Sequence, residues 1–484
     1  MAAEQPQLAE VASRAFGWSF LNTAVSRLGT LAIGIVLARV LGPVEFGTFA
    51  VATVALLAML SFNDLGVSLA IVRWKDDPRA ITGTVTSISV VTSAVLVVAV
   101  WFTAPAFCAA MGDPAATGVV RLMALSILIN GFVATPAALM QRAFQQRRRM
   151  AIDQVNTWLG AAVSLILALS GLGAISLAIG RITGGVVSGV MFVAWSPQRY
   201  RFGFDLVLAR SLLRFGLPLA GASVVVFAVG YADQLVTGIL LGSTALGFYV
   251  LAFNLASWPV SIFSQPLRSV APAAFARLQH DPTQMNLAFH RTLRLLVAIA
   301  MPACLLLAGV ADPLVTVVYG NAWEPAAPVL MLLGVVAAMR IIFELSYDFL
   351  VVRGRSRGIL IVQLVWLVVG IPALIIGARL DGLRGIALAQ LVVVVAVVFP
   401  AYLVVLRGAG LKTGVVLAQL WPATLLGLAV LFAARGIASA VDQPLLACLL
   451  AGFVALGAVS LGLARQRPEL LALRTQWREG SRRR

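Results

Sequence analysis

The chain has 484 residues, of which 61% are hydrophobic and only 11% are charged. Soluble globular domains carry roughly 25% charged residues, so this composition excludes an ordinary water-soluble enzyme or binding module. A formal net charge of +17 would suggest nucleic-acid binding in a soluble protein, whereas in a membrane protein it is typical of basic cytoplasmic loops.

Long apolar runs recur from one end of the chain to the other. About 20 apolar residues are enough to cross a hydrocarbon core of about 30 Å as a helix. Backbone groups in lipid must pair within their own segment or in a closed barrel, and these runs lack the alternation of barrel strands. We therefore predict an all-α integral membrane protein with about fourteen spans. These lie near residues 16–41, 46–70, 82–107, 115–138, 154–173, 174–195, 211–241, 246–275, 288–310, 325–351, 358–378, 383–406, 412–434 and 443–464.

The distribution of basic residues gives the orientation of these spans. With the N-terminus in the cytoplasm, 27 of the 36 Lys and Arg residues fall in cytoplasmic loops and tails, and three fall in outer loops. Cytoplasmic loops carry the excess of Lys and Arg in membrane proteins. We therefore expect a multi-pass protein whose N- and C-termini are both cytoplasmic.

A helical hairpin is repeated in the sequence. The pattern LGxxxxG, followed two residues later by an aromatic side chain, begins at Leu41 and again at Leu241. The copies lie six spans apart and so point the same way, which predicts two parallel six-helix lobes related by an axis along the membrane normal. The predicted parts are an N-lobe at 1–195, a cytoplasmic linker at 196–214, a C-lobe at 215–406, two extra C-terminal helices at 407–464 and an Arg-rich cytoplasmic tail at 465–484.

Five short motifs, spread over residues 20–350, carry a family resemblance. They lie at 62–73 (FNDLG to VR), 213–218 (LRFGLP), 233–249, 271–278 and 319–328 (YGNAW to AAP). In this order they resemble polysaccharide exporters of the Wzx type, in the multidrug/oligosaccharidyl-lipid/polysaccharide (MOP) superfamily, and most of all the WzxC-like lipopolysaccharide and exopolysaccharide exporters.

This resemblance implies a flippase of the bacterial plasma membrane. Such proteins move undecaprenyl-pyrophosphate-linked oligosaccharide repeat units from the inner to the outer leaflet by alternating access. The expected partners are the lipid-linked oligosaccharide, membrane lipids, and a polymerase and export complex, without nucleic acid.

Four arginines inside the predicted spans are candidates for binding the pyrophosphate. Ionisable residues in a membrane are costly and usually face a cavity or a partner. A guanidinium group matches phosphate with planar, bidentate donors. The candidates are Arg27, Arg181, Arg268 and Arg340. In related lipid-linked-precursor flippases basic residues on the first and eighth helices line such a cavity, and Arg27 and Arg268 lie on those helices.

Three acidic residues are candidates for coupling transport to an ion gradient. Asp64, Asp233 and Glu344 lie in or beside spans, where a carboxylate can hold a proton or Na⁺. Two alternatives remain open, because Asp64 and Asp233 can instead pair with arginines, and Glu344 can pair with Arg340 on the same helix face. Ile33 stands where Asp233 would have its counterpart in the first repeat.

Signatures of catalysis are missing from the sequence. It contains no P-loop, no GxSxG and no nucleophilic Cys/His pair, and its three cysteines have no metal-ligand spacing. We therefore expect a protein that is not an enzyme and that holds no cofactor and no metal ion. The alternatives are a cation-coupled drug or metabolite antiporter of the same superfamily, a lipid II flippase, or a membrane polymerase or ligase. The short outer loops disfavour the enzyme, and the buried arginines favour an anionic cargo.

Overall fold

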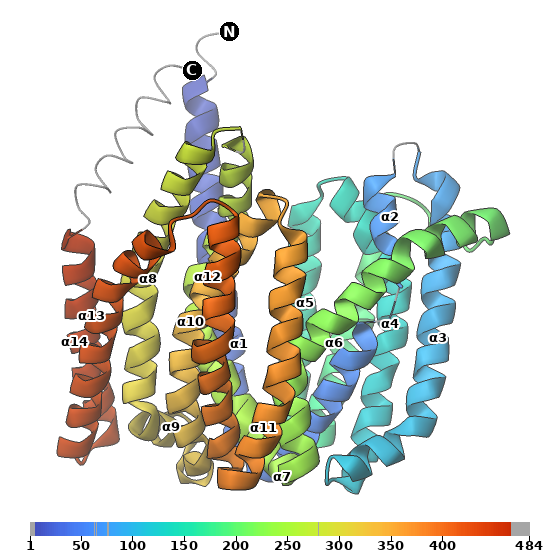
Figure 1. Cartoon of the computed structure of the whole chain (residues 1–484). Coiled ribbons are helices and arrows are strands. Elements are labelled where there is room, and N and C mark those ends of the chain that lie inside the picture. Colours follow the sequence, from blue (N-terminus) through green and yellow to red (C-terminus); the bar gives the residue numbers. More distant parts are fainter. Residues whose placement is uncertain (1–4, 62, 64, 75–76, 279, 466–484) are drawn as a thin grey trace. The chain divides into compact units, whose positions relative to one another are not determined.

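The structure is a computed structural model that describes residues 5–61, 63, 65–74, 77–278 and 280–465. It describes no side chains for residues 5–28, 30–31, 222, 263–274, 277, 463 and 465. Every regular element in the described part of the chain is a helix, as predicted from the apolar runs (Figure 1).

The chain forms two compact units, residues 1–227 and 228–484. Unit 1 contains α1 (Gln5–Leu60), α2 (Ser68–Arg73), α3 (Arg79–Ala110), the 3₁₀ turn η1 (Pro114–Ala116), α4 (Thr117–Arg142), α5 (Gln146–Leu169), α6 (Ala174–Ala194) and the start of α7 (Leu206–Arg277). Unit 2 contains the rest of α7, α8 (Pro282–Gly309), α9 (Ala311–Tyr319), η2 (Asn321–Ala326), α10 (Ala327–Val352), α11 (Ser356–Val393), the π-helical turn η3 (Val394–Val398), α12 (Phe399–Gly408), α13 (Thr413–Ala440) and α14 (Pro444–Arg465). The division falls inside α7, and the expected linker at 196–214 lies within unit 1.

Eleven helical stretches in the described part of the chain are long and apolar enough to cross a membrane. Three of the helices, α1, α7 and α11, contain non-helical residues at Gly42, Gly242 and Asp381–Gly382. The ribbon reverses direction near each of these points (Figure 1). Counting each of the three as two segments gives fourteen, in agreement with the number predicted from the sequence.

The repeated hairpin turns on the same backbone geometry in both units. Gly42 has φ 71° and ψ 176°, and Gly242 has φ 85° and ψ 176°. L-residues that carry a Cβ atom rarely adopt these backbone angles, which are found almost only at glycine. A Cβ atom would meet nothing within 4 Å at either position, so glycine is required for its conformation rather than for space. The prediction that each LGxxxxG copy forms one helical hairpin is confirmed.

Acidic residues in unit 1 fix the ends of helices. Glu45 Oε2 accepts a hydrogen bond of 2.6 Å from the backbone N–H of Ala174, the first residue of α6. Asp113 accepts one of 3.2 Å from the N–H of Ala116 in η1 and another of 2.6 Å from the Thr48 hydroxyl. The first N–H groups of a helix have no partner inside the helix, so these carboxylates complete the turns.

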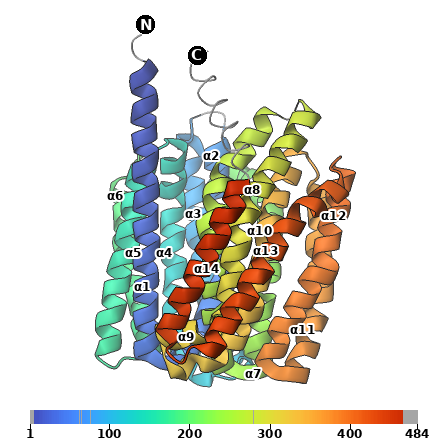
Figure 2. The same ribbon diagram turned by 90° about the vertical axis from the view of Figure 1, so that its left-hand side faces the viewer.

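The two C-terminal helices pack against unit 2. Figures 1 and 2 both show α13 and α14 side by side, and α13 also packs on α8. At the contact between α8 and α13, a Cβ atom on Gly309 would lie 2.7 Å from Ala434 Cβ, and one on Gly427 would lie 2.6 Å from Leu305 Cδ1. Glycine therefore allows the two backbones to approach closely, as is common between membrane helices.

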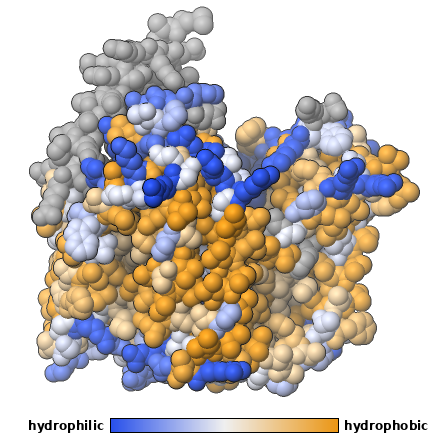
Figure 3. Space-filling view, viewed as in Figure 1, coloured by the Kyte–Doolittle hydropathy of each residue, from blue (hydrophilic) through white to orange (hydrophobic). Residues whose placement is uncertain are grey.

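The surface is consistent with a position in a bilayer. On the face shown in Figure 3, hydrophobic residues cover the middle of the helices and hydrophilic residues gather toward the helix ends. Large apolar side chains such as Phe102, Phe432 and Phe453 are 69–76% exposed. Soluble proteins rarely expose extended apolar surface, so this belt is the part that lipid covers.

Candidate functional site

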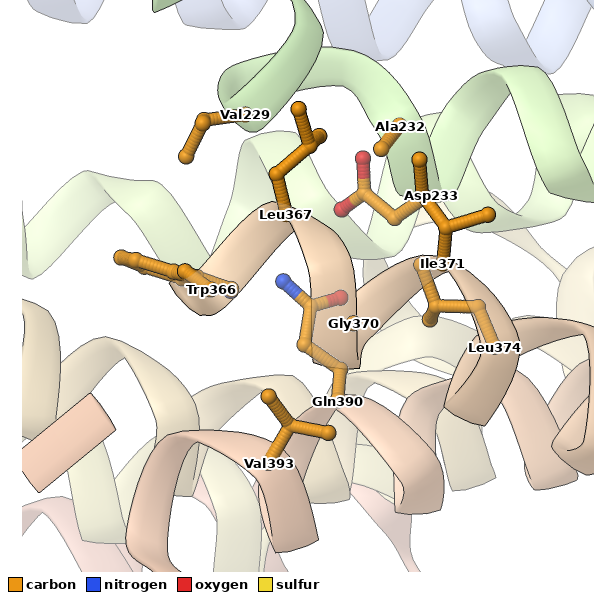
Figure 4. Close-up of a pocket in the computed structure, with 10 residues that line it drawn as sticks. All are labelled: Val229, Ala232, Asp233, Trp366, Leu367, Gly370, Ile371, Leu374, Gln390 and Val393. Carbon is orange, nitrogen blue, oxygen red and sulfur yellow. The ribbon is translucent and has the colours of Figure 1, made fainter. Parts of the chain in front are cut away.

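A small, partly open cavity lies in unit 2, between α7 and the two halves of α11 (Figure 4). Its wall is mostly apolar, and its polar side chains are the carboxylate of Asp233 and the amide of Gln390. The remaining lining residues are Val229, Ala232, Trp366, Leu367, Gly370, Ile371, Leu374 and Val393. Its ten lining residues leave room for an ion or a few water molecules and not for a lipid-linked oligosaccharide.

Asp233 is the buried acidic residue of this cavity, with only 5% of its surface exposed. Its Oδ1 accepts a hydrogen bond of 2.8 Å from the backbone N–H of Gln234, and its Oδ2 accepts one of 2.8 Å from the hydroxyl of Tyr249. Tyr249 belongs to the second segment of α7 and is fully buried. The bond between them therefore joins the two arms of the α7 hairpin beneath the Gly242 turn.

The hydroxyl of Tyr249 also contacts Oε1 of Gln390. A phenol has one proton and can donate it to only one of these two acceptors at a time. With Asp233 protonated, Asp233 donates to Tyr249 and Tyr249 donates to Gln390. With Asp233 ionised, Tyr249 donates to the carboxylate, and the Gln390 amide presents its NH₂ group to Tyr249. The triad can therefore accommodate either protonation state by reversing its hydrogen bonds.

The first repeat provides an internal comparison for this pair. At the offset of 200 residues, Asp233 corresponds to Ile33 and Tyr249 corresponds to Phe49. Ile33 and Phe49 pack against the same apolar cluster in unit 1. Both polar groups are therefore present together in one repeat and absent together from the other, which indicates that the pair has a role specific to unit 2.

A π-helical turn follows the cavity directly. It spans Val394–Val398, immediately after the lining residue Val393, and Pro400 follows in α12. Single π turns inside α-helices are rare and occur frequently at functional sites. The helix that carries Gln390 therefore changes from α-helical to π-helical geometry next to the cavity.

Arg340, a predicted pyrophosphate ligand, lies on α10 in the same unit and is close enough to act electrostatically on Asp233 and Tyr249. Its guanidinium carbon lies 5.1 Å from the centre of the Phe253 ring, and its Nη1 donates a long hydrogen bond of 3.4 Å to Ser257. Arg340 is half-buried, and these partners are weak for a guanidinium group and leave donors available for an anion.

Glu344 lies on α10 and is the predicted intrahelical partner of Arg340. The described residues include both side chains, and these form no ion pair with each other. Glu344 is half-buried, and no hydrogen bond or ion pair to its side chain is present among the described residues. The alternative in which Arg340 and Glu344 neutralise each other on one helix face is therefore not found.

Arg181 lies on α6 in unit 1, and its side chain is exposed. Leu177, Gly184 and Ser188, which share its helix face at i−4, i+3 and i+7, are all buried. Val190, on another face, is 64% exposed. Arg181 therefore projects from the packed side of α6, and it has no hydrogen-bond or ion-pair partner among the described residues.

The glycines around Arg181 let α5 approach α6 closely. A Cβ atom on Gly180 would lie 2.0 Å from Ser164 Oγ and 2.4 Å from the Gly160 carbonyl oxygen, and one on Gly184 would lie 2.5 Å from the Asn156 carbonyl oxygen. These glycines are therefore required for helix packing.

The remaining predicted site residues lie outside the described part of the structure. Arg27 is on α1 and Arg268 is on α7, but their side chains are not described, and Asp64 is not described at all. Their proposed roles in binding pyrophosphate or an ion remain predictions from the sequence.

Three residues of the site, Tyr249, Trp366 and Gln390, are not among the site residues predicted from the sequence. Comparison of the two repeats could have identified Tyr249, because its hydroxyl and the Asp233 carboxylate are both replaced by apolar groups in the first copy. No comparable signal marks Trp366, which joins the site only through the fold of α11.

Comparison with known proteins identifies relatives over most of the chain. The model of a family described as "Polysaccharide biosynthesis protein" matches residues 36–328. The chain is 25% identical over 392 residues to the lipopolysaccharide biosynthesis protein WzxC of Escherichia coli K12, covering 81% of this chain and 80% of the relative. It is 26% identical to the succinoglycan biosynthesis transport protein ExoT of Rhizobium meliloti 1021, covering 67% of this chain and 66% of the relative.

Solved structures share the fold at low sequence identity. A structure of the lipid II flippase MurJ in an inward closed conformation matches with a TM-score of 0.77 and 12% identity, covering 93% of this chain and all of the other. An inward-facing multidrug transporter of the MATE family, in the MOP superfamily, matches with a TM-score of 0.62 and 16% identity, covering 79% and 95%.

Proposed function

The chain belongs to the family of polysaccharide biosynthesis proteins, and we propose that it flips an undecaprenyl-pyrophosphate-linked oligosaccharide across the bacterial plasma membrane. The observation that carries this proposal is the family match, together with similarity to a lipopolysaccharide biosynthesis protein over four fifths of each chain. A lipid with a charged and glycosylated head crosses a bilayer slowly, so an assembly pathway with lipid-linked intermediates needs a transporter at this step.

Arginines within the spans supply the affinity for the pyrophosphate in this proposal. Arg181 and Arg340 each lie at membrane depth without a strong anionic partner among the described residues. Such groups are costly in lipid unless an anion or water meets them. Arg27 and Arg268 complete the proposed set. The alternative is a cation-coupled drug or metabolite antiporter, which the carboxyl group of Asp233 in the described cavity would also suit.

Deletion of the gene is the first test of this function. We expect cells without it to accumulate the undecaprenyl-pyrophosphate-linked repeat unit on the cytoplasmic side and to lose the mature polymer, which mass spectrometry of extracted lipids measures. Accumulation of lipid II instead would identify a peptidoglycan flippase. Unchanged polymer with altered drug sensitivity would identify the antiporter.

We further propose that Asp233 couples flipping to an ion gradient through the triad with Tyr249 and Gln390. The triad changes its hydrogen bonds with the protonation of Asp233 and joins α7 to α11, so a bound proton alters the contact between helices that line the cavity. Sodium is the second candidate, because the carboxylate and amide oxygens are suitable ligands.

Vesicles with imposed gradients test the coupling. We expect a proton gradient to accelerate flipping of the lipid-linked repeat unit by wild-type protein, and Asp233→Asn to abolish the acceleration. Acceleration by a sodium gradient alone would assign Na⁺ to the site. A rate that responds to neither gradient would eliminate coupling while leaving the flippase function intact.

The proposed membrane location follows from the distribution of charge. The described part of the chain makes a multi-pass membrane protein. We propose that both termini are cytoplasmic, because the basic residues then gather in cytoplasmic loops. A polymerase and an export complex are the further partners that this role implies.

A further inference from the structure

The non-helical segment between α6 and α7, residues 195–205, combines exposed aromatic rings with exposed arginines. Phe202 and Phe204 are 60% and 67% exposed. Arg199 and Arg201, which alternate with them along the chain, are exposed too. A surface that mixes bare aromatic rings with guanidinium groups is typical of the boundary between lipid headgroups and acyl chains. We call these residues the α6–α7 segment.

Hydrogen bonds and close packing hold the α6–α7 segment on α3. The backbone N–H of Gly203 donates a hydrogen bond of 3.3 Å to the hydroxyl of Ser87, and the N–H of Asp205 donates one of 3.3 Å to the hydroxyl of Thr84. A Cβ atom on Gly83 would lie 3.2 Å from the backbone nitrogen of Gly203. The segment is therefore docked within unit 1, and its exposed side chains have a defined place on the surface.

Ser87, which binds the segment, lies on the lipid-facing side of α3. The residues that follow it at steps of four, four, three and four share its helix face. They are Val91, Val95, Val98 and Phe102, and they are 56–76% exposed. Large apolar side chains exposed over this length belong in hydrocarbon. The α6–α7 segment therefore lies where the lipid-facing surface of α3 ends.

The level of the segment along α3 matches the surface of the membrane. Ser87 is eight residues from the start of α3 at Arg79, which is roughly 12 Å at 1.5 Å per residue. The start of α3 is charged and exposed, with Arg79 paired to Asp77 at 3.9 Å, and it suits water. The exposed apolar stripe begins one turn beyond Ser87. In the proposed orientation, the segment thus lies at the cytoplasmic boundary of the hydrocarbon.

The charge around the segment favours an anionic partner. Residues 199–214 contain one acidic residue, Asp205, and four exposed arginines. The arginines are Arg199, Arg201, Arg210 and Arg214. Asp205 caps α7, because its Oδ1 accepts hydrogen bonds of 2.9 and 3.0 Å from the N–H groups of Val207 and Leu208. None of the four arginines forms a hydrogen bond or ion pair with another residue in the described part of the chain, so their donors are available to phosphate oxygens.

We propose that the α6–α7 segment binds the phosphate headgroups of anionic phospholipids in the cytoplasmic leaflet. Arg199 and Arg201 bind the phosphates, and the rings of Phe202 and Phe204 enter the top of the acyl-chain layer. Continuity with the lipid-facing stripe of α3 favours a lipid over an acidic soluble protein as the partner. A bound headgroup would anchor the start of α7, the helix through which the chain passes from unit 1 to unit 2.

Quenching of a local fluorophore tests the preference for anionic lipid. The reporter is an environment-sensitive fluorophore on Val207→Cys, an 82% exposed position next to the segment. A Cys448→Ser background leaves only two other cysteines, both buried. The full-length protein is placed in vesicles of equimolar phosphatidylcholine and phosphatidylglycerol, with brominated chains on one lipid or the other. We expect brominated phosphatidylglycerol to quench about twice as strongly as brominated phosphatidylcholine, because clustered basic residues concentrate anionic lipid around them.

Two pairs of substitutions separate a local site from an effect of net charge. Arg199→Gln with Arg201→Gln should bring the ratio of quenching by the two lipids close to one. Arg147→Gln with Arg148→Gln removes the same charge from exposed positions at the start of α5 and should leave the ratio unchanged. Arg199→Lys with Arg201→Lys keeps the charge and should keep most of the preference.

Three outcomes would overturn the proposal. Equal quenching by the two lipids before any arginine is replaced would show that the segment does not select anionic headgroups. An equal fall of the ratio in both glutamine pairs would assign the preference to the total charge of the protein. Quenching by neither lipid would show that the segment lies away from the membrane, and an acidic protein would then be the partner to seek.

Discussion

A buried carboxylate is stable in unit 2 because its neighbours complete its hydrogen bonds. Asp233 receives one bond from the backbone of Gln234 and one from Tyr249. Desolvation of a carboxylate costs several kcal/mol, so each of these bonds has a large effect when it is lost. The same property makes the residue suited to holding a proton, since small changes in its surroundings alter its charge.

Tyr249→Phe should therefore destabilise the protein by about 1–3 kcal/mol, the usual cost of leaving a buried polar group unsatisfied. Thermal unfolding in detergent measures the change, and Tyr347→Phe, at a 37% exposed position, is the matched control with little expected effect. Adding Asp233→Asn should make the combined loss smaller than the sum of the two single losses, because the partners share one interaction. Strictly additive losses would contradict the pairing.

At the scale of elements, the two hairpins depend on glycine at one position each. The φ of Gly242 is 85°, in a region that residues with a Cβ atom avoid. Gly242→Ala should lower stability by about 1–3 kcal/mol and reduce yield in the membrane. Gly221→Ala lies in the helical part of α7 with nothing within 4 Å, and it should be neutral or mildly stabilising. Similar behaviour of the two variants would exclude a special turn at Gly242.

The elements that sequence could predict are those with a local cause. Apolar runs and the LGxxxxG repeat predicted the membrane helices and the hairpins, because lipid and glycine geometry act at the position where they occur. The π turn at Val394–Val398 lies in a valine-rich run, and no residue in that run indicates where the helix geometry changes. Arg340 lies over the ring of Phe253 and forms no ion pair with Glu344. This position depends on how α10 packs against α7, which the periodicity of the sequence does not predict.

The candidate site was predictable in part for the same reason. Asp233 is conspicuous because a carboxylate is rare in an apolar run, whereas Gln390 and Trp366 become neighbours of it only when α11 folds back at Asp381–Gly382.

At the scale of the molecule, the number of membrane crossings, odd or even, depends on whether the chain reverses direction inside α1, α7 and α11. If the break at Asp381–Gly382 were only a bend, α11 and α12 would make one crossing instead of two. The loop between α13 and α14 would then lie on the same side of the membrane as the loop between α10 and α11. With a reversal, the two loops lie on opposite sides.

Single cysteines at Ser356 and Asp442, both exposed at helix ends, decide between these arrangements in a Cys448→Ser background. We expect an impermeant maleimide to label Asp442→Cys in intact spheroplasts and to label Ser356→Cys only after the membrane is permeabilised. This pattern follows from fourteen crossings with the basic loops in the cytoplasm. Labelling of both positions from the outside, or of neither, would contradict the α11–α12 hairpin; labelling of Ser356→Cys alone would reverse the proposed orientation.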